Sequence, residues 1–323
     1  KEQEKSWRES MLFGIKQFGR RLWWLGIRGE KREREAFWYH LCHRLQKSKG
    51  SSSTMTFTPN ADLEELLQKP INTQTDQKYP LISIIVLTYN HLTLNKQCLR
   101  SIYHETTYPN YEVILVDNAS TDGTKEWLMS LAPTKHCKVI LNKENLGFAA
   151  GNNAGIKEAK GDFIVLLNND TYVTEDWLTN LWKKFQIDDK LGMCGAVTNS
   201  IGNEAKIDTE NVEQYKKEHQ GEVYQDPRAL AFFCVMIKKQ VIDECGLLDE
   251  NYGKGMFEDD DYAEAVRRAG WKLAIAEDSF VWHLESASFR KLDKKEFRSI
   301  FETNRKYYEH KWGKKWIPHG TRK

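Results

Sequence analysis

The chain has 323 residues, of which 40% are hydrophobic and 29% are charged, and its net charge is +2. This length suits one large domain with an appendage, or two domains, and the composition provides enough apolar residues for a core. A net charge so close to zero argues against nucleic acid as the main partner. No apolar run reaches the ~20 residues that span a bilayer, and no apolar segment indicates a signal peptide. We therefore expect neither a nucleic acid partner nor a transmembrane segment.

Positive charge is concentrated in the first 50 residues, which hold 13 Lys and Arg against 6 acidic residues. Between residues 11 and 45, apolar and aromatic residues recur at helical spacing among the basic ones. This pattern predicts a helical appendage over residues 1–49. It either contacts a membrane surface peripherally or packs on the main domain or a partner chain. Residues 50–79 are mostly polar and predict a linker.

The six cysteines are scattered, form no CxxC pair and lie in several cases within apolar runs. This distribution favours buried, reduced thiols, which are typical of a reducing compartment. We therefore expect a cytoplasmic protein, with the appendage able to hold it at the inner face of the membrane.

Apolar runs alternate with amphipathic segments over residues 80–290, and a basic, aromatic tail follows over residues 291–323. Strands are expected at 81–90, 111–116, 138–141 and 162–170, with helices at 91–106, 124–131 and 147–159 between them. Further along we expect a helix at 171–186, strands at 191–199 and 232–239, short helices at 212–218 and 240–246, a helix at 257–269, a bent strand or strand pair at 271–283 and a tail helix at 294–312. Strands separated by single helices predict an α/β fold with a mostly parallel sheet flanked by helices.

Three glycines, Gly147, Gly151 and Gly155, recur at intervals of four on the predicted helix at 147–159. This spacing differs from the GxGxxG fingerprint of dinucleotide-binding proteins, which also follows a strand directly. A nicotinamide-dependent dehydrogenase therefore loses support. On a helix the spacing places the glycines on one face, which predicts close backbone packing or the close approach of a ligand.

Acidic residues stand where several predicted elements begin or end. Asp117 and Asp170 follow buried strands, and ligands bind beyond the carboxyl ends of parallel strands. The alternative for Asp170 is a cap of the next helix. Four acids, Glu258 to Asp261, open the predicted helix at 257–269. A helix dipole offsets only ~0.3–1 kcal/mol for each of them, so the cluster indicates a ligand or a catalytic role.

These acids suit a metal site and a proton transfer. One acid and one histidine, such as His283 at the end of the predicted strand, can hold a divalent cation whose other positions go to phosphate oxygens and water. A separate carboxylate can then serve as general base. The chain has no GxSxG elbow, P-loop or HExxH motif. Two close acids would also suit glycoside hydrolysis, although that reaction needs neither a metal nor a nucleotide-binding sheet.

Six segments in this order resemble the inverting glycosyltransferases of family 2. They are IIVLTYN (84–90), VDNASTDGT (116–124), NLGFAAGNNAGI (145–156), LLNND (166–170), FEDDDYAEAVRRAG (257–270) and VWH (281–283). The resemblance covers about residues 80–313, and NLGFAAGNN is similar to the rhamnosyltransferase-like and galactofuranosyltransferase-like branch. It implies the GT-A fold, a Rossmann-like sheet that binds the nucleotide.

Matched position by position, the resemblance implies roles for individual residues. Asp259 corresponds to the general base, and Asp170 and His283 to the metal-binding residues. Asp117 corresponds to the carboxylate that accepts the N3–H of uracil or thymine. The residues implied around the nucleotide are Asp117, Thr88, Tyr89, Asn90, Asn145, Gly147, Asn152, Asn168 and Asn169, and those implied on the acceptor side or in support of it are Glu258, Asp261 and Cys234. Asn168 replaces the first acid of the family's DxD motif, so the chain has no carboxylate at the position that makes the family's usual ribose contact.

The function that the resemblance implies is metal-dependent, with Mn²⁺ or Mg²⁺. A sugar is transferred with inversion from a UDP or TDP sugar to a hydroxyl of a glycan, lipid-linked or protein acceptor. Separately, we expect the acceptor to bind at residues 200–235 and Ser286–Arg290. The alternative is a non-catalytic scaffold that binds nucleotide sugars and docks a partner or a membrane through its N-terminal segment. The tail helix is expected to pack either internally or across a homodimer.

Overall fold

The structure is a computed structural model of the chain, and it describes residues 79–132, 137–199, 203, 207, 211–283 and 294–319. The predicted appendage at 1–49, the predicted linker up to residue 78 and the expected acceptor segment Ser286–Arg290 lie outside these ranges. Within them, no helix is both apolar enough and long enough to cross a membrane.

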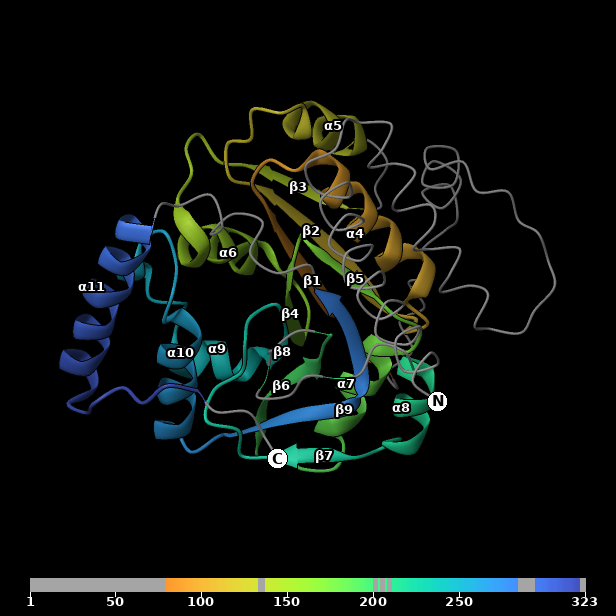
Figure 1. The fold of residues 1–323 in the computed structure, drawn as a ribbon. Coiled ribbons are helices and arrows are strands. Elements are labelled where there is room, and N and C mark those ends of the chain that lie inside the picture. Colours follow the sequence, from red (N-terminus) through yellow and green to blue (C-terminus); the bar gives the residue numbers. More distant parts are fainter. Residues whose placement is uncertain are drawn as a thin grey trace, which may run out of the picture. The chain divides into compact units, whose positions relative to one another are not determined.

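The described residues form nine strands: β1 (Ile82–Thr88), β2 (Tyr111–Asp117), β3 (Lys138–Leu141), β4 (Phe163–Asn168), β5 (Thr171–Val173), β6 (Leu191–Val197), β7 (Val223–Gln225), β8 (Cys234–Lys238) and β9 (Lys272–His283). Their order in the sheet is β3-β2-β1-β4-β8-β6-β9-β5, and β7 also pairs with β9 (Figure 1). Strands β3, β2, β1 and β4 are parallel, whereas β8 is antiparallel to both β4 and β6. The prediction of an α/β fold with a central sheet is confirmed, and the half beyond β4 is mixed.

Helices flank this sheet within the described ranges: α4 (Leu92–Glu105), α5 (Thr124–Leu131), α6 (Gly147–Glu158), α7 (Trp177–Phe185), α8 (Val212–Glu218), α9 (Lys239–Cys245), the 3-10 helix η3 (Glu250–Tyr252), α10 (Glu258–Arg268) and α11 (Lys294–Trp312). Helices α4, α5 and α6 connect the parallel strands, as expected from their amphipathic segments. The tail helix α11 lies beside α10 (Figure 1), and its side chains hydrogen-bond to α10 of the same chain. The tail therefore packs internally.

The prediction of a helix from residue 171 is wrong at its beginning. Residues Thr171–Val173 form β5, which pairs antiparallel with the end of β9, so that Thr171 faces His283 and Val173 faces Val281. The helix begins only at Trp177, after Asp176 in the left-handed region (φ 62). Thr171 and Val173 are β-branched, and such residues favour a strand over a helix, so this segment is more stable paired with β9 than as a helical turn. Strand β7, within the stretch at 200–228, was also not predicted.

One edge of the sheet gathers the carboxyl ends of several strands. Thr88 is paired with Asp117, and Leu87 with Asn168, so β1, β2 and β4 end at the same level. Strand β6 runs parallel to β4 because both are antiparallel to β8, and β9 runs parallel to β6. The end of β9 at His283 therefore reaches this edge too, where ligands of open α/β sheets bind.

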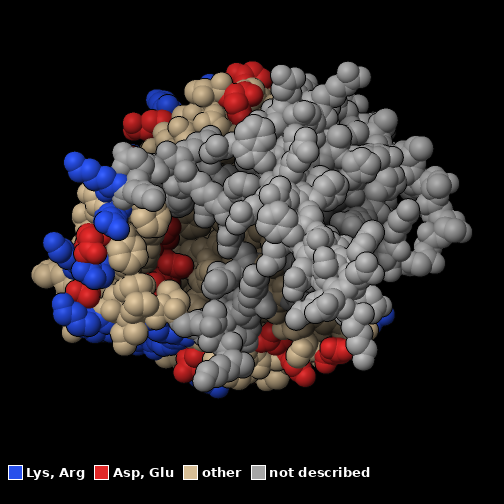
Figure 2. All heavy atoms as spheres, viewed as in Figure 1, with Lys and Arg blue, Asp and Glu red and all other residues tan. Residues whose placement is uncertain are grey.

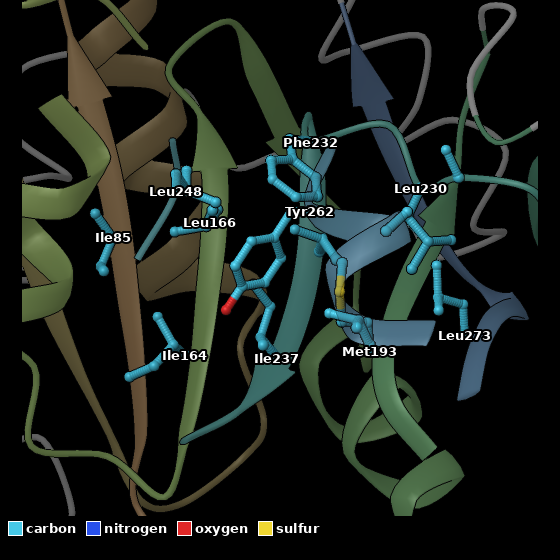
Figure 3. Packing of buried hydrophobic residues seen from close by; sticks show 14 of the residues in the cluster. Ile85, Ile164, Leu166, Met193, Leu230, Phe232, Ile237, Leu248, Tyr262 and Leu273 are labelled. Carbon is cyan, nitrogen blue, oxygen red and sulfur yellow. The ribbon is translucent and has the colours of Figure 1, made fainter. Parts of the chain in front are cut away.

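The core between α10 and the sheet is apolar. Figure 3 shows Tyr262 of α10 packed over the sheet, among Ile164 of β4, Ile237 of β8 and Phe232. The Tyr262 ring lies 6.3 Å from that of Phe232, which precedes β8 at the carboxyl edge. Helix α10 is thereby fixed with its first turn close to that edge.

The predicted glycine face of α6 lies directly on the sheet. A Cβ atom at Gly155 would lie 2.5 Å from Cγ2 of Ile85 in β1, and one at Gly151 would lie 2.6 Å from a methyl group of Leu87. Of the two expectations for these glycines, close packing is the one that the structure shows at both positions.

We expect Gly155→Val to lower the free energy of unfolding by about 1–3 kcal/mol, because the added methyl groups overpack the contact with Ile85. Urea titration of both proteins measures the difference. The control is Lys157→Val at an exposed position of the same helix, which introduces the same residue without the clash. Equal losses in the two variants would contradict the packing role of Gly155.

Candidate active site at the carboxyl edge

Asp117 is a fully buried carboxylate at the end of β2. Its Oδ1 accepts a hydrogen bond from Thr88 Oγ1 at 3.3 Å, and its Oδ2 accepts one from the backbone N–H of Ser120 at 3.0 Å. The structure thus brings together two of the residues that we predicted at the nucleotide, Thr88 and Asp117.

The loops that follow β1 and β2 are bonded to each other. The N–H of Asn90 donates to Ser120 Oγ at 2.7 Å, and the N–H of Thr121 donates to Asn90 Oδ1 at 2.8 Å. Asn90 and Ala119 both have positive φ, at 58° and 65°. Such strained residues persist only where the surroundings fix them, and they cluster at functional sites. Tyr89, between the strand and this loop, is 40% exposed and accessible to a ligand.

Asn118, which sequence reasoning did not single out, organises the next loop. Its Nδ2 donates to Asn145 Oδ1 at 2.9 Å and to the Gly147 carbonyl at 3.0 Å, while its Oδ1 accepts from Asn142 Nδ2 at 3.0 Å. Gly147 has φ +82°, and a Cβ atom there would lie 1.9 Å from the carbonyl oxygen of Gly253. The loop before α6 therefore lies against the turn that leads to α10.

Asn152 and its neighbour Asn153 are both buried in α6. Asn152 Nδ2 donates to the Phe148 carbonyl of the same helix at 3.0 Å. Asn153 Nδ2 instead reaches the Leu248 carbonyl and Glu250 Oε1, both at 2.9 Å. The Asn153 side chain, which was not predicted, thus links α6 to the segment before α10. The Asn152 side chain bonds to the backbone of α6 itself.

Asp170 and His283 lie together, as the sequence predicted. The distance from His283 Nε2 to Asp170 Oδ1 is 3.3 Å, and Asn168 Nδ2 is 3.5 Å from the same nitrogen. Asn169 points elsewhere, because its Nδ2 donates to Asn95 Oδ1 in α4 at 2.6 Å. Of the NND segment, Asn168 and Asp170 therefore face the histidine.

His283 is held by residues that the sequence did not mark. Asn199 accepts from the His283 N–H at 2.7 Å and donates to its carbonyl at 3.1 Å. The ring of Phe233 stacks on the imidazole, with centroids 5.2 Å apart and planes at 16°. These contacts fix the imidazole beside Asp170.

The donor set at Asp170 fits a divalent cation that shares its coordination with a ligand. Within the described part of the chain, no three His, Cys, Asp or Glu side chains gather into a metal site. Asp170 and His283 provide one oxygen and one nitrogen ligand. Mg²⁺ and Mn²⁺ suit such a site, because they are commonly held by one or two protein groups, substrate phosphates and water.

The four acids of α10 divide into two pairs. Asp261 accepts from Tyr252 Oη, Lys311 Nζ and Trp312 Nε1, each at 2.8 Å. Asp260 is bonded to Arg228, Trp316 and His319, at 3.3, 3.1 and 3.0 Å. These contacts relieve the repulsion expected of four adjacent carboxylates.

Two residues predicted on the acceptor side are buried. Asp261 is buried in this network, and Cys234 is fully buried in β8, so neither is exposed to solvent.

Glu258 and Asp259 lack such partners. Glu258 is buried, and its Oε2 has no hydrogen-bond partner among the described residues. Asp259 is half-buried, and its Oδ1 accepts from the Asp260 N–H at 2.9 Å. Burial, and next the charge of Asp259, raise the pKa of Glu258. Burial, and next the charge of Asp260, raise the pKa of Asp259. Raised carboxyl pKa values are typical of groups that exchange protons at neutral pH.

Two consecutive aromatic residues link helix α10, which carries Glu258 and Asp259, to the Asp170–His283 pair. Phe232 contacts Tyr262 of α10, and Phe233 stacks on His283. Helix α10, at Tyr262 in its second turn, and the Asp170–His283 pair therefore contact the same short aromatic segment. On the face in Figure 2, acidic side chains stand at the margin of a recess, at the level where α10 begins in Figure 1.

Comparison with known proteins identifies the family and the fold of the chain. The family model described as Glycosyl transferase family 2 matches residues 83–246. The uncharacterized protein y4gI of Sinorhizobium fredii is 28% identical over 254 residues, which are 72% of this chain and 28% of that protein. The chain matches less than half the length of each of the first three curated relatives.

Two solved structures share the fold. The mannosyltransferase PcManGT from Pyrobaculum calidifontis, in complex with GDP-Man and Mn²⁺, has a TM-score of 0.56 at 22% identity and covers 80% of this chain and 71% of its own. GalNAc-T7 with UDP, GalNAc and Mn²⁺ has a TM-score of 0.54 at 16% identity and covers 64% of this chain and 44% of its own. The family match spans about half of the chain, including Asp117 and Asp170, so the chain belongs to glycosyl transferase family 2.

Proposed function

We propose that the protein transfers a sugar from a nucleoside diphosphate sugar to a hydroxyl group of a glycan, lipid-linked or protein acceptor, with inversion at the anomeric carbon. The observation that carries this proposal is that Phe232 and Phe233 link two elements: Phe233 stacks on His283, which lies beside Asp170, and Phe232 contacts Tyr262 of α10, the helix that carries Glu258 and Asp259. The Asp170–His283 pair suits a diphosphate with its cation, and the Glu258–Asp259 pair suits proton removal. The family assignment supports it.

In this mechanism Asp259 accepts the proton of the acceptor hydroxyl as that oxygen attacks the anomeric carbon. The C–O bond to the diphosphate breaks in the same step, so the product has the opposite anomeric configuration. No protein nucleophile is needed. Burial raises the pKa of Cys98 and Cys194 to about 12, which keeps these thiols protonated and unreactive.

Asp170 and His283 would hold Mg²⁺ or Mn²⁺ beside the diphosphate. A bound divalent cation would neutralise the negative charge that develops on the leaving diphosphate. Asn199 and Phe233 keep the imidazole in place for this role. Residues that hold a metal ligand in its orientation typically contribute a factor of about 10–100 in metal affinity.

The donor nucleotide is inferred from Asp117 at the end of β2, because each of its carboxylate oxygens accepts one hydrogen bond within the fold and can accept a second. The N3–H of uracil or thymine can donate to such an oxygen, whereas N3 of cytosine carries no proton and would be repelled. A site built around a buried polar group rejects a base that leaves the group unpaired. We therefore propose a UDP or TDP sugar as the donor.

A thermal-shift panel of UDP, TDP, CDP and GDP sugars with Mn²⁺, followed by detection of the released nucleotide, tests this proposal. We expect UDP or TDP sugars to stabilise the fold, by about 2.7 kcal/mol when the ligand is 100-fold above its Kd, and CDP sugars to have no effect. Asp117→Asn should remove the shift. Stabilisation by GDP sugars alone would contradict the pyrimidine assignment, and binding without nucleotide release in the presence of acceptors would indicate a scaffold.

A further inference from the structure

The segment that leads into the Glu258–Asp259 pair has an unusual backbone. Met256 and Phe257, directly before Glu258, both lie in the left-handed region, with φ 77° and 78°. This conformation costs an L residue roughly 1–2 kcal/mol, and two in succession persist only where other parts of the fold enforce them. The direction in which α10 begins depends on these two residues.

The enforcing contacts come from the tail helix. Asn304 of α11 is 6% exposed, and its Nδ2 donates to three carbonyl oxygens of this segment: Tyr252 at 3.0 Å, Gly255 at 2.9 Å and Met256 at 3.1 Å. An amide NH₂ has two protons, so at least one proton is shared between two of the three carbonyl oxygens. The three carbonyls converge on one side chain, which fixes the turn on both sides of Gly255.

Aromatic packing reinforces the same contact. Phe257 lies within a small cluster with Tyr252 and Tyr308 of α11, separate from the main core. The centroids of Phe257 and Phe301 are 5.2 Å apart, and Trp316 lies at the same distance from Phe257. The left-handed Phe257 is therefore held by its ring as well as by its backbone.

The tail also holds the residues that follow the pair. Lys311 Nζ bridges Asp249 Oδ2 at 2.6 Å and Asp261 Oδ2 at 2.8 Å. Burial opposes ionisation of Asp249, but hydrogen bonds, first from Lys311 and next from the N–H of Asn251, lower its pKa to about 2, so the bridge is ionic at neutral pH. Trp312 Nε1 donates to Asp261 Oδ1, and Trp316 Nε1 and His319 Nε2 bond to Asp260 Oδ2.

These contacts stop on either side of the proposed catalytic pair. The tail bonds the backbone up to Met256 and the side chains of Asp260 and Asp261, while Glu258 and Asp259 have no hydrogen bond to it among the described residues. From this pattern we infer that α11 is part of the catalytic site: Asn304 is a positioning residue that fixes Asp259 for proton transfer. The inference rests on the proposed function.

Asn304→Leu tests this role, because leucine has a similar volume and no donor. We expect kcat to fall by about 100-fold, since a displacement of ~1 Å can cost this much, while KM for the donor stays within about two-fold because the Asp117 and Asp170 side is untouched. The acid limb of the pH profile of kcat should shift. Hydrogen exchange should become faster in the peptide that spans residues 252–261.

Two further variants make the result decisive. Thr303→Leu, at the neighbouring exposed position of α11, should leave kcat and exchange unchanged. Trp312→Phe removes the hydrogen bond to Asp261 and keeps an aromatic ring beside Arg268 and Lys311, so it should fold even if Asn304→Leu does not, with kcat reduced by about ten-fold.

Two outcomes separate the inference from the proposed function. A lower Tm with unchanged kcat, pH profile and exchange in both Asn304→Leu and Trp312→Phe would overturn the positioning role. A wild-type protein without transferase activity would overturn the proposed function, whereas the exchange experiment still reports whether α11 fixes the segment at 252–261.

Discussion

The Asp259→Asn variant is expected to lose at least about 100-fold in kcat, the lower end of what a general base contributes. Asparagine has the same shape but cannot accept the proton of the acceptor hydroxyl at neutral pH. Donor binding, which depends on Asp117 and Asp170, should stay within about two-fold of wild type, since a group that acts in the transition state contributes little to ground-state binding. Steady-state kinetics with a saturating donor and titration calorimetry with UDP measure these two quantities.

The pH profile provides an independent readout of the same residue. A general base must be ionised, so activity should fall as pH decreases through the pKa of Asp259. Burial, and next the charge of Asp260, raise this pKa above the ordinary value for aspartate, which is about 3.9. The acid limb of kcat/KM should therefore lie above that value in the wild type and disappear in Asp259→Asn.

Glu264→Gln is the matched control, because it removes one carboxylate from the same helix at a position that is paired with Arg268 and Lys314. It should retain turnover within a few-fold of wild type. Near-normal turnover of Asp259→Asn, or an acid limb that survives in it, would reject Asp259 as the base. Glu258, whose pKa is also raised, would then be the next residue to test.

The fold was predictable where its signals are local. Apolar runs such as those ending at Thr88, Asp117 and Asn168 mark strands buried on both faces, and each ends in polar residues. Parallel strands connected by helices bring these ends to one edge, so the proximity of Thr88 to Asp117 follows from the pattern. The glycine face of α6 followed from spacing in the same way.

Contacts between distant segments were not predictable in this way. The three residues of β5 are a strand only because they pair with the end of β9, far along the chain. Asn118, Asn199 and Asn304 each hold backbone or side chains of another segment, and nothing beside them in the sequence indicates a partner. An asparagine inside a helix is as compatible with solvent exposure as with such a contact.

The acid cluster shows the same limit within a single motif. Its composition indicated a functional role for the group, but not which members carry it. Asp260 is paired with Arg228 and hydrogen-bonded to His319, and Asp261 is paired with Lys311; these partners come from other parts of the chain. Only these tertiary contacts distinguish the anchored acids from Glu258 and Asp259.

The second large effect is expected for Asp170→Asn, which keeps the volume of the side chain but removes its charge. Neutralisation of the leaving diphosphate contributes several kcal/mol, so losing a cation ligand should reduce turnover by about 1,000-fold, which corresponds to about 4 kcal/mol. The loss should also appear without turnover: titration calorimetry should show that Mn²⁺ strengthens UDP binding to the wild type and much less to the variant. EDTA should abolish wild-type activity, and Mn²⁺ or Mg²⁺ should restore it.

Asp189→Asn is the control for this experiment, because Asp189 is exposed and lies just before β6, at the opposite edge of the sheet. It removes the same charge and should leave both the calorimetric response and the turnover unchanged. The effect at Asp170 depends on its position beside His283, 3.3 Å away, and not on net charge. If the Asp170 variant retained both Mn²⁺-dependent UDP binding and turnover in EDTA, the cation would have no role at this pair, and charge on the diphosphate would have to be neutralised by the protein alone.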